Sequence, residues 1–211
     1  AATIASAKPK GPAGKFVPLE KGDYYPLDIL LSSVPLESKL PLVKAVNEKC
    51  FALSPLVTKV NVVFYDEQKR ILVVTSDGVK AEDLLPRTYL NVGVVAEKDG
   101  RRERSGWNIG GRREFSFYTP AVADRLAKCA VDRAVFLFEA IQPPAGEMPV
   151  VLGPGITGVL LHEAVGHGME ADFNRKKTST YSTMIGKKVA EPFVTIIDDA
   201  TVPNLLGSIN V

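Results

Sequence analysis

The sequence predicts an α+β fold in which an antiparallel sheet packs against helices. Two observations lead to this prediction. Between residues 57 and 117, runs of alternating apolar and polar residues, rich in β-branched side chains, are separated by Asp-Gly turn signals. Segments with the apolar spacing of helices lie before and after these runs. Strands that follow one another through short turns pair antiparallel, so we expect one meandering sheet of sequential hairpins.

The first half of the chain should contain a lead-in, one helix and most of the strands. Residues 1–24 are rich in Ala, Lys, Pro and Gly and are expected to be a flexible lead-in. A helix is expected from Pro35 to Leu53, with Pro41 near its start, where a helix tolerates proline. We expect strands at Val57–Tyr65, Ile71–Thr75 and Tyr89–Glu97, a fourth that includes Phe115 and Phe117, and turns at Asp66–Lys69, Asp77-Gly78 and Asp99-Gly100.

The clearest amphipathic helix is expected from Thr119 to Gln142. Thr119 can cap its first turn, and Pro120 suits the first helical position. The Pro-Pro-Ala-Gly sequence that follows ends the helix and marks a domain boundary. We therefore expect residues 25–145 to form part of one domain and residues 146–211 to begin a second. In the second domain we expect strands at Met148–Leu152 and Phe193–Ile197 and a polar loop at Asn174–Thr183.

The overall composition excludes several classes of protein. Hydrophobic content of 45% and charged content of 24% are ordinary for a soluble globular chain, and the formal net charge of +2 gives no support for nucleic-acid or membrane binding. No apolar run is long enough to span a membrane, and no secretory signal follows Lys8 and Lys10. Cys50 and Cys129 have no short spacing, so we expect reduced core cysteines in a cytoplasmic protein.

A basic stretch from Arg101 to Arg113 contains five arginines, Trp107 and a Gly-Gly pair. Basic, aromatic and glycine residues together can bind single-stranded nucleic acid. A hairpin connection with solvated charges is the simpler interpretation, and we favour it. A third hypothesis is that Arg112 and Arg113 hold a peptide carboxylate or a partner subunit.

Both histidines of the chain lie in the sequence HEAVGHGMEADFNR at residues 162–175. Glu163 follows His162, and His167 comes five residues after His162. At about 100° per residue, positions five apart are separated by about 140°, so the two imidazoles diverge on a regular α-helix. They converge only if the helix contains an extra residue, as in a π turn. Gly166 tolerates the unusual backbone angles that such a distortion can need.

These residue types favour a metal site with its own base. Two neutral imidazoles can bind Zn²⁺, and a carboxylate beside them can take a proton from water. A catalytic zinc site needs a third protein ligand. Glu170 and Asp172 are either ligands or groups that orient an imidazole, and Glu191 is a more distant candidate. The alternative is that the histidines pack at a helix end and Glu163 is a solvated charge. The adjacent carboxylates of Asp198 and Asp199 could also be ligands, but a turn at the end of a strand is the interpretation we favour.

The stretch from Met148 to Ser182, and above all residues 162–175, closely resembles the TldD/PmbA family of metallopeptidases, in its TldD branch. Residues 194–211 resemble the family's continuation, and residues 76–115 resemble its more variable N-terminal region. The resemblance implies an N-terminal α/β domain and a β-rich C-terminal domain. It also implies that His162 and His167 are zinc ligands and that Glu163 is the catalytic base.

The same resemblance implies a function and a partner. TldD-type members cleave short or unfolded peptides and pair with a homologous TldE/PmbA-type subunit, so a heterodimer or a homodimer is expected. Their third zinc ligand is a Cys far downstream, beyond Val211 in this numbering. We therefore expect this chain to be a fragment that is inactive alone. The alternatives are a non-catalytic peptide-binding partner subunit and a structural metal site, which would have four protein ligands.

Overall fold

The computed structural model describes residues 17–18, 24–76 and 78–208. The chain divides into two compact units, one of Ala1–Ile141 with Asp199–Val211 and one of Gln142–Asp198. The first unit contains a sheet and two long helices. The second contains short helices and loops, and it carries both histidines.

The sheet of the first unit is built on β3 (Val79–Lys98), which pairs with a strand on each side. β2 (Val57–Val74) runs antiparallel to it, from Val57 opposite Ala96 to Val74 opposite Lys80. β4 (Arg101–Gly111) runs antiparallel along the other edge, and the short β1 (Val17–Pro18) joins that edge in parallel. The predicted antiparallel meander is therefore confirmed.

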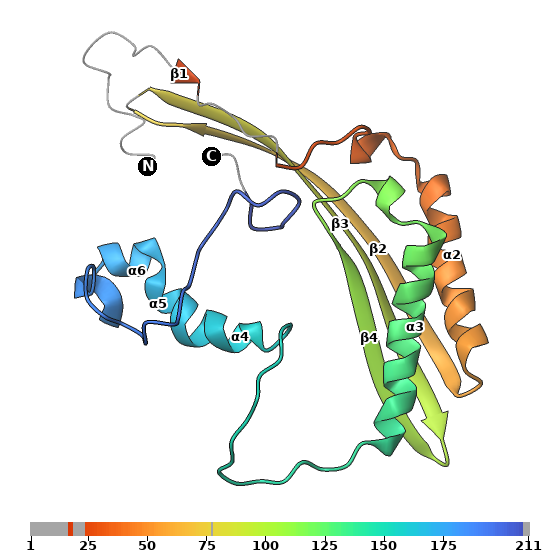
Figure 1. The fold of residues 1–211 in the computed structure, drawn as a ribbon. Helices are drawn as coiled ribbons and strands as arrows, with labels where there is room; N and C mark the ends of the chain where they lie inside the picture. Colours follow the sequence, from red (N-terminus) through yellow and green to blue (C-terminus); the bar gives the residue numbers. More distant parts are fainter. Residues whose placement is uncertain (1–16, 19–23, 77, 209–211) are drawn as a thin grey trace. The chain divides into compact units, whose positions relative to one another are not determined.

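Helices α2 (Leu36–Leu53) and α3 (Pro120–Phe136) lie side by side on one face of this sheet (Figure 1). Alternate residues of β3 turn toward the helices and are fully buried, as the period of two in a strand requires. Small residues on the facing side of α3 let the helix approach the strands closely. The buried core is Val46 and Cys50 of α2, Val57 of β2, Leu90, Val92, Val94 and Ala96 of β3, Tyr118, and Ala123, Leu126, Ala127, Ala130, Val131 and Ala134 of α3.

The two predicted helices of this unit are confirmed, with one difference in length. Thr119 caps α3, because its side chain accepts a hydrogen bond from the Val122 amide, and Pro120 occupies the first turn. The helix ends earlier than expected: after Phe136 the chain forms the 3-10 helix η3 (Leu137–Glu139). The expected turn at Asp99-Gly100 is confirmed, since both residues have positive φ, 51° and 77°, as a tight hairpin needs.

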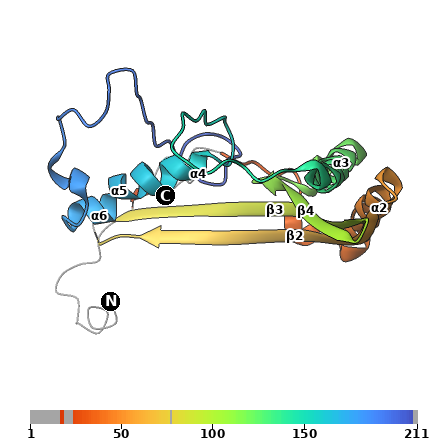
Figure 2. The same cartoon turned by 90° about the horizontal axis from the view of Figure 1, so that it is seen from below.

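Three predictions for this unit are wrong: one turn, one hairpin connection and one strand. β2 continues through the expected turn at Asp66–Lys69, because each of these residues pairs with a residue of β3 between Leu85 and Thr88. β2 and β3 extend beyond the two helices (Figure 2). Of the four residues of the expected turn, Glu67 and Lys69 are exposed. The basic stretch expected to be a hairpin connection is β4 itself, whereas the 3-10 helix η2 (Phe115–Phe117) replaces the expected fourth strand.

The second unit consists of helices and loops. Its helices are α4 (Gly158–Leu161), the π-helix η4 (His162–Gly166), α5 (His167–Met169), α6 (Ala171–Arg175) and the 3-10 helix η5 (Thr180–Thr183). The strands expected at Met148–Leu152 and Phe193–Ile197 are wrong. A strand needs a hydrogen-bonded neighbour, and in the described residues neither segment has one. Their apolar side chains are exposed instead.

No helix in the described ranges combines the length and the apolar character needed to cross a membrane.

The segment after Asp199 belongs to the first unit and is fastened to it by backbone contacts. The Asn204 amide donates to the Tyr24 carbonyl at 2.8 Å. Asp199 itself accepts hydrogen bonds from the amide and hydroxyl of Thr201, which lower its carboxyl pKa, and this fits the expected turn.

Candidate metal centre

His162 and His167 lie on one continuous helix that is widened by a single π turn. α4, η4 and α5 follow one another without a break from Gly158 to Met169, and the His167 amide donates to the His162 carbonyl five residues earlier. The extra residue in this turn brings the two rings together, with centroids 4.5 Å apart and planes at 70°. The π distortion that the His spacing required is present.

Gly166 has a different role from the expected one. Its φ of −57° and ψ of −54° are ordinary helical angles, so the π turn needs no backbone conformation that only glycine adopts. A Cβ at this position would lie 3.9 Å from Nδ1 of His162 and 3.8 Å from the Leu161 carbonyl oxygen. The space beside the His162 ring at Gly166 is therefore large enough for a Cβ, which would make an ordinary van der Waals contact with the ring.

Glu163 completes a compact group of possible ligands. One ligand atom each from His162, Glu163 and His167 lies within 4.8 Å of the other two, and no other such group of three occurs in the described residues. Oε2 of Glu163 is 3.4 Å from Nε2 of His167, and all three side chains are exposed. Imidazoles are ligands that Zn²⁺ takes in catalytic sites, and a carboxylate beside them can serve as a base, so these residues fit a zinc ion.

Glu170 contacts this group from the other side of the His167 ring. Its Oε1 lies 2.5 Å from Nδ1 of His167. An ionised carboxylate can only accept, so the shorter contact to Glu170 favours the neutral tautomer of His167 that carries its proton on Nδ1 and leaves the lone pair of Nε2 on the side of Glu163. A carboxylate that holds the second nitrogen of a metal-binding histidine is a common arrangement in metal sites.

The other acidic residues considered from the sequence lie outside the group. Asp172 is 3.3 Å from Lys176 on the surface of α6, and Glu191 is 3.0 Å from Lys188. Neither belongs to the cluster around the histidines. In the part of the chain that the structure describes, the carboxylates within 4.0 Å of a histidine nitrogen are those of Glu163 and Glu170.

Arg112 and Arg113 are held by contacts within the first unit. Arg112 donates to the carbonyls of Pro86 and Leu206, at 3.1 and 3.0 Å, and its guanidinium lies 5.4 Å from the Tyr25 ring centroid. The guanidinium of Arg113 lies 5.3 Å from the centroid of Phe117. These contacts give Arg112 a structural role between β3 and the segment after Asp199. A role for either arginine toward a peptide or a partner stays a prediction.

Sequence reasoning missed the residues that hold the end of the continuous helix Gly158–Met169, called the metal helix below. Ser179 donates from Oγ to the Gly168 carbonyl at 2.5 Å, and Asn174 donates to the same carbonyl at 3.0 Å. The Tyr181 ring packs so closely that a Cβ on Gly168 would lie 2.8 Å from it. Gly168, directly after His167, was the signal that another group approaches the helix there.

Comparisons with known proteins match both units of the chain to domains of one family. Residues 29–136 match the family model of the PmbA/TldA metallopeptidase central domain, and residues 145–211 match that of the PmbA/TldA metallopeptidase C-terminal domain. The chain is 40% identical over 186 residues to a Metalloprotease TldD homolog of Haemophilus influenzae, covering 86% of this chain and 39% of the relative. It is 38% identical over 182 residues to a TldD homolog of Buchnera aphidicola, covering 83% and 38%.

The chain thus spans about two fifths of the length of these curated relatives. Among solved structures, a proposed DNA gyrase modulator of Thermotoga maritima matches with a TM-score of 0.69 and 20% identity, covering 94% of this chain and 45% of that one. Another from Bacteroides thetaiotaomicron matches with a TM-score of 0.68 and 15% identity, covering 96% and 47%. At these identities the structural matches establish the fold alone.

Proposed function

The chain belongs to the PmbA/TldD family of metallopeptidases, and from this premise we propose that it forms part of a zinc-dependent peptidase that cleaves short or unfolded peptides. One observation carries the proposal. The π turn brings the rings of His162 and His167 to 4.5 Å, and Glu163 lies beside them. A helix packed only for stability needs neither the widened turn nor a carboxylate next to two exposed imidazoles.

In this proposal His162 and His167 hold the metal through ring nitrogens. Glu170 fixes the orientation of the His167 ring through Nδ1 and leaves Nε2 available as a ligand. When bound, zinc would polarise a peptide carbonyl and make water more acidic. A third protein ligand is expected from a downstream Cys, as the family resemblance implies, because a catalytic site needs three protein ligands and one open position.

Glu163 is the proposed general base. Its carboxylate is exposed and lies 3.4 Å from Nε2 of His167, so it can take a proton from a water molecule next to the ligand atoms. The same carboxyl group can then give the proton to the departing amine, so that the nitrogen leaves as a neutral group. We further propose that the peptidase pairs with a homologous TldE/PmbA-type subunit or with a second copy of itself.

Zinc content and cleavage test the proposal together. After dialysis against zinc, elemental analysis of a version extended through a relative's downstream segment should show one bound ion that is lost in His162→Ala and in His167→Ala, and this chain is measured beside it. Cleavage of an unfolded fluorogenic peptide is measured in the extended version. There Glu163→Gln should keep zinc but slow cleavage by roughly 10²- to 10⁴-fold.

Three outcomes would reject parts of this proposal. Absence of zinc in both versions under metal-replete conditions would reject the metal site and favour a non-catalytic peptide-binding subunit. Undiminished cleavage by Glu163→Gln would remove Glu163 from the role of base. Zinc that is held tightly but never accompanied by cleavage would favour a structural site.

A further inference from the structure

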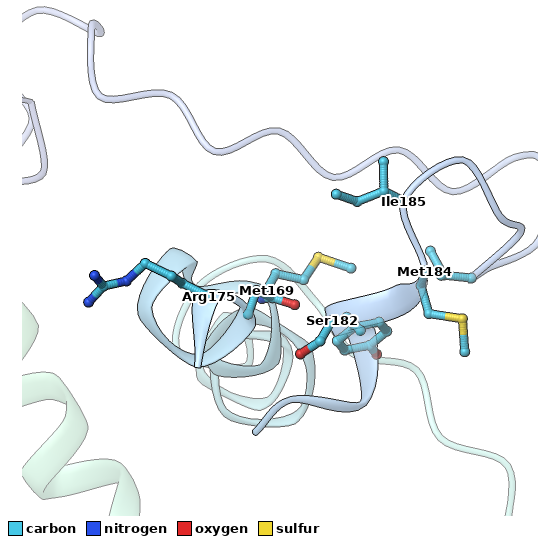
Figure 3. Close-up of a pocket in the computed structure, with 8 residues that line it drawn as sticks. Met169, Arg175, Ser182, Met184 and Ile185 are labelled. Atoms are coloured by element: carbon cyan, nitrogen blue, oxygen red, sulfur yellow. The ribbon is translucent and has the colours of Figure 1, made fainter. Parts of the chain in front are cut away.

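A largely apolar pocket of about 520 Å³ lies beside the metal helix within the second unit. Its apolar lining comes from Met169, Tyr181, Met184, Ile185 and Val189 (Figure 3). The volume falls in the range of about 300–1,000 Å³ that is usual for small-ligand sites. Most of these side chains are well exposed, and Ile185 is 96% exposed. Clustered exposed apolar side chains next to a candidate active site indicate a binding surface.

The pocket and the metal helix form one continuous piece of structure. Met169 is the last residue of α5, two positions after His167, and contributes one wall. Tyr181 contributes another wall while its ring packs on Gly168, the residue between His167 and Met169. The Ser179 hydroxyl, which accepts from the Tyr181 amide at 3.1 Å and donates to the Gly168 carbonyl, fastens this wall to the helix. A group bound here is therefore held at a fixed place relative to His167.

The polar donors of the lining are engaged in other contacts or turned away. The Ser182 hydroxyl donates to the Ser179 carbonyl at 2.8 Å. The Asn174 amide donates to the carbonyls of Gly168 and Glu170, at 3.0 and 2.8 Å, so both of its donors are used. The guanidinium of Arg175 points away from the space between Met169 and Ile185 (Figure 3). The two methionines have flexible side chains that can adapt to ligands of different shape. An apolar occupant without a fixed shape fits this lining best.

We propose that this pocket binds an aliphatic or aromatic side chain of the peptide substrate. The proposal rests on the proposed peptidase function and deepens it, since it gives the enzyme a preference for peptides that carry apolar side chains. Burial of one such side chain removes apolar surface from water and should favour binding of the peptide that carries it.

The test measures binding without metal and without cleavage. Fluorescein-labelled pentapeptides Ala-Ala-X-Ala-Ala, with X as Leu, Phe or Asp, are titrated with this chain in EDTA and followed by fluorescence anisotropy. The Leu and Phe peptides should bind at least about tenfold more tightly than the Asp peptide. Ile185→Asp should remove this preference, whereas Ile156→Asp should keep it. Ile156 is a matched control, because it is 88% exposed in the same unit and outside the pocket lining.

Equal binding of the three peptides, no binding of any of them, or an unchanged preference in Ile185→Asp would each overturn the proposal. The comparison of peptides on the unaltered chain does not depend on how a variant folds. Failure of the peptidase function gives a different pattern, in which zinc or cleavage is missing but the apolar preference in EDTA persists. If zinc binding and Glu163-dependent cleavage are present and the preference is missing, only the pocket assignment falls.

Discussion

Nδ1 of His167 lies 2.5 Å from the carboxylate of Glu170, three residues further along the chain. This contact fixes which ring nitrogen of His167 can face a metal, so its loss should weaken metal binding without removing a ligand. Glu170→Ala should raise the zinc dissociation constant of the chain by roughly 10- to 100-fold. Competition with a chromophoric chelator measures that constant. ¹⁵N NMR of the imidazole should show mainly the Nδ1–H tautomer in the unaltered chain and a mixture in Glu170→Ala.

Asp172→Asn is the matched control for this change. Asp172 is also an exposed carboxylate near the histidines in sequence, but it pairs with Lys176. Its neutralisation should leave both the zinc affinity and the His167 tautomer unchanged. If Asp172→Asn weakened zinc as much as Glu170→Ala, general negative charge rather than the Nδ1 contact would explain the effect.

The site could be anticipated from the sequence because its geometry is local. The interval of five residues between His162 and His167 allows ring convergence only through a widened turn, and the turn is there. The fastening of this helix by Ser179 and Tyr181 could not be anticipated, because it depends on how the following loop folds back. Spacing along a helix carries information about ring geometry, but it carries none about which loop residue will contact Gly168.

The strands show where local patterns fail. β4 lies at the edge of the sheet and has many exposed Arg and Glu side chains, which form ion pairs such as Arg101–Glu103 at 2.8 Å. Because its sequence is so rich in charged residues, it resembles that of a loop. β2 continues through Asp66 because Thr88 of β3 pairs with it, a partner 22 positions away. Conversely, Met148–Leu152 has the composition of a strand, but composition cannot supply the neighbour that a strand needs.

Gly166 and Gly168 should respond differently to the same substitution. A Cβ on Gly166 meets nothing closer than 3.8 Å, so Gly166→Ala should leave zinc affinity within about threefold. A Cβ on Gly168 would lie 2.8 Å from the Tyr181 ring, which must then move. Gly168→Ala should therefore lower the local opening free energy of residues 178–183 by about 1–3 kcal/mol. Hydrogen exchange measured by mass spectrometry should show faster exchange in that segment.

A double substitution separates this clash from a backbone effect of glycine. Tyr181→Ala removes the ring that the new Cβ would meet, so adding Gly168→Ala to Tyr181→Ala should cost almost nothing further. Equal acceleration of exchange by Gly168→Ala in both backgrounds would show that contact with Tyr181 is not the cause.

Arg112 should matter for stability more than Arg113. Arg112 donates to the Pro86 and Leu206 carbonyls, so Arg112→Ala removes both hydrogen bonds and one of the attachments of the segment after Asp199. We expect the free energy of unfolding in urea to fall by about 2 kcal/mol. Arg113→Ala loses a cation–π contact with Phe117 and should cost about 0.5–1 kcal/mol.

Arg112→Lys distinguishes the paired hydrogen bonds from positive charge alone. A single ammonium cannot reproduce the planar fork that reaches both carbonyls, so lysine should restore less than half of the lost stability. Full recovery by lysine, or a larger loss from Arg113→Ala than from Arg112→Ala, would contradict this account of the segment's attachment.

Cys50 should make the first unit less stable in alkali. Its side chain is fully buried between α2, α3 and the sheet, and burial raises the pKa of its thiol from the ordinary 9.0 to about 11. Between these values the unfolded chain loses the thiol proton while the folded chain keeps it, so stability falls as pH rises. From pH 8 to pH 10 this group should remove about 1 kcal/mol from the free energy of unfolding in urea. Cys50→Ala should lose this part of the decline, although the cavity it creates lowers the free energy of unfolding at every pH. Cys129→Ala is the control and should keep the decline. An identical decline in Cys50→Ala would assign the alkaline sensitivity to other groups.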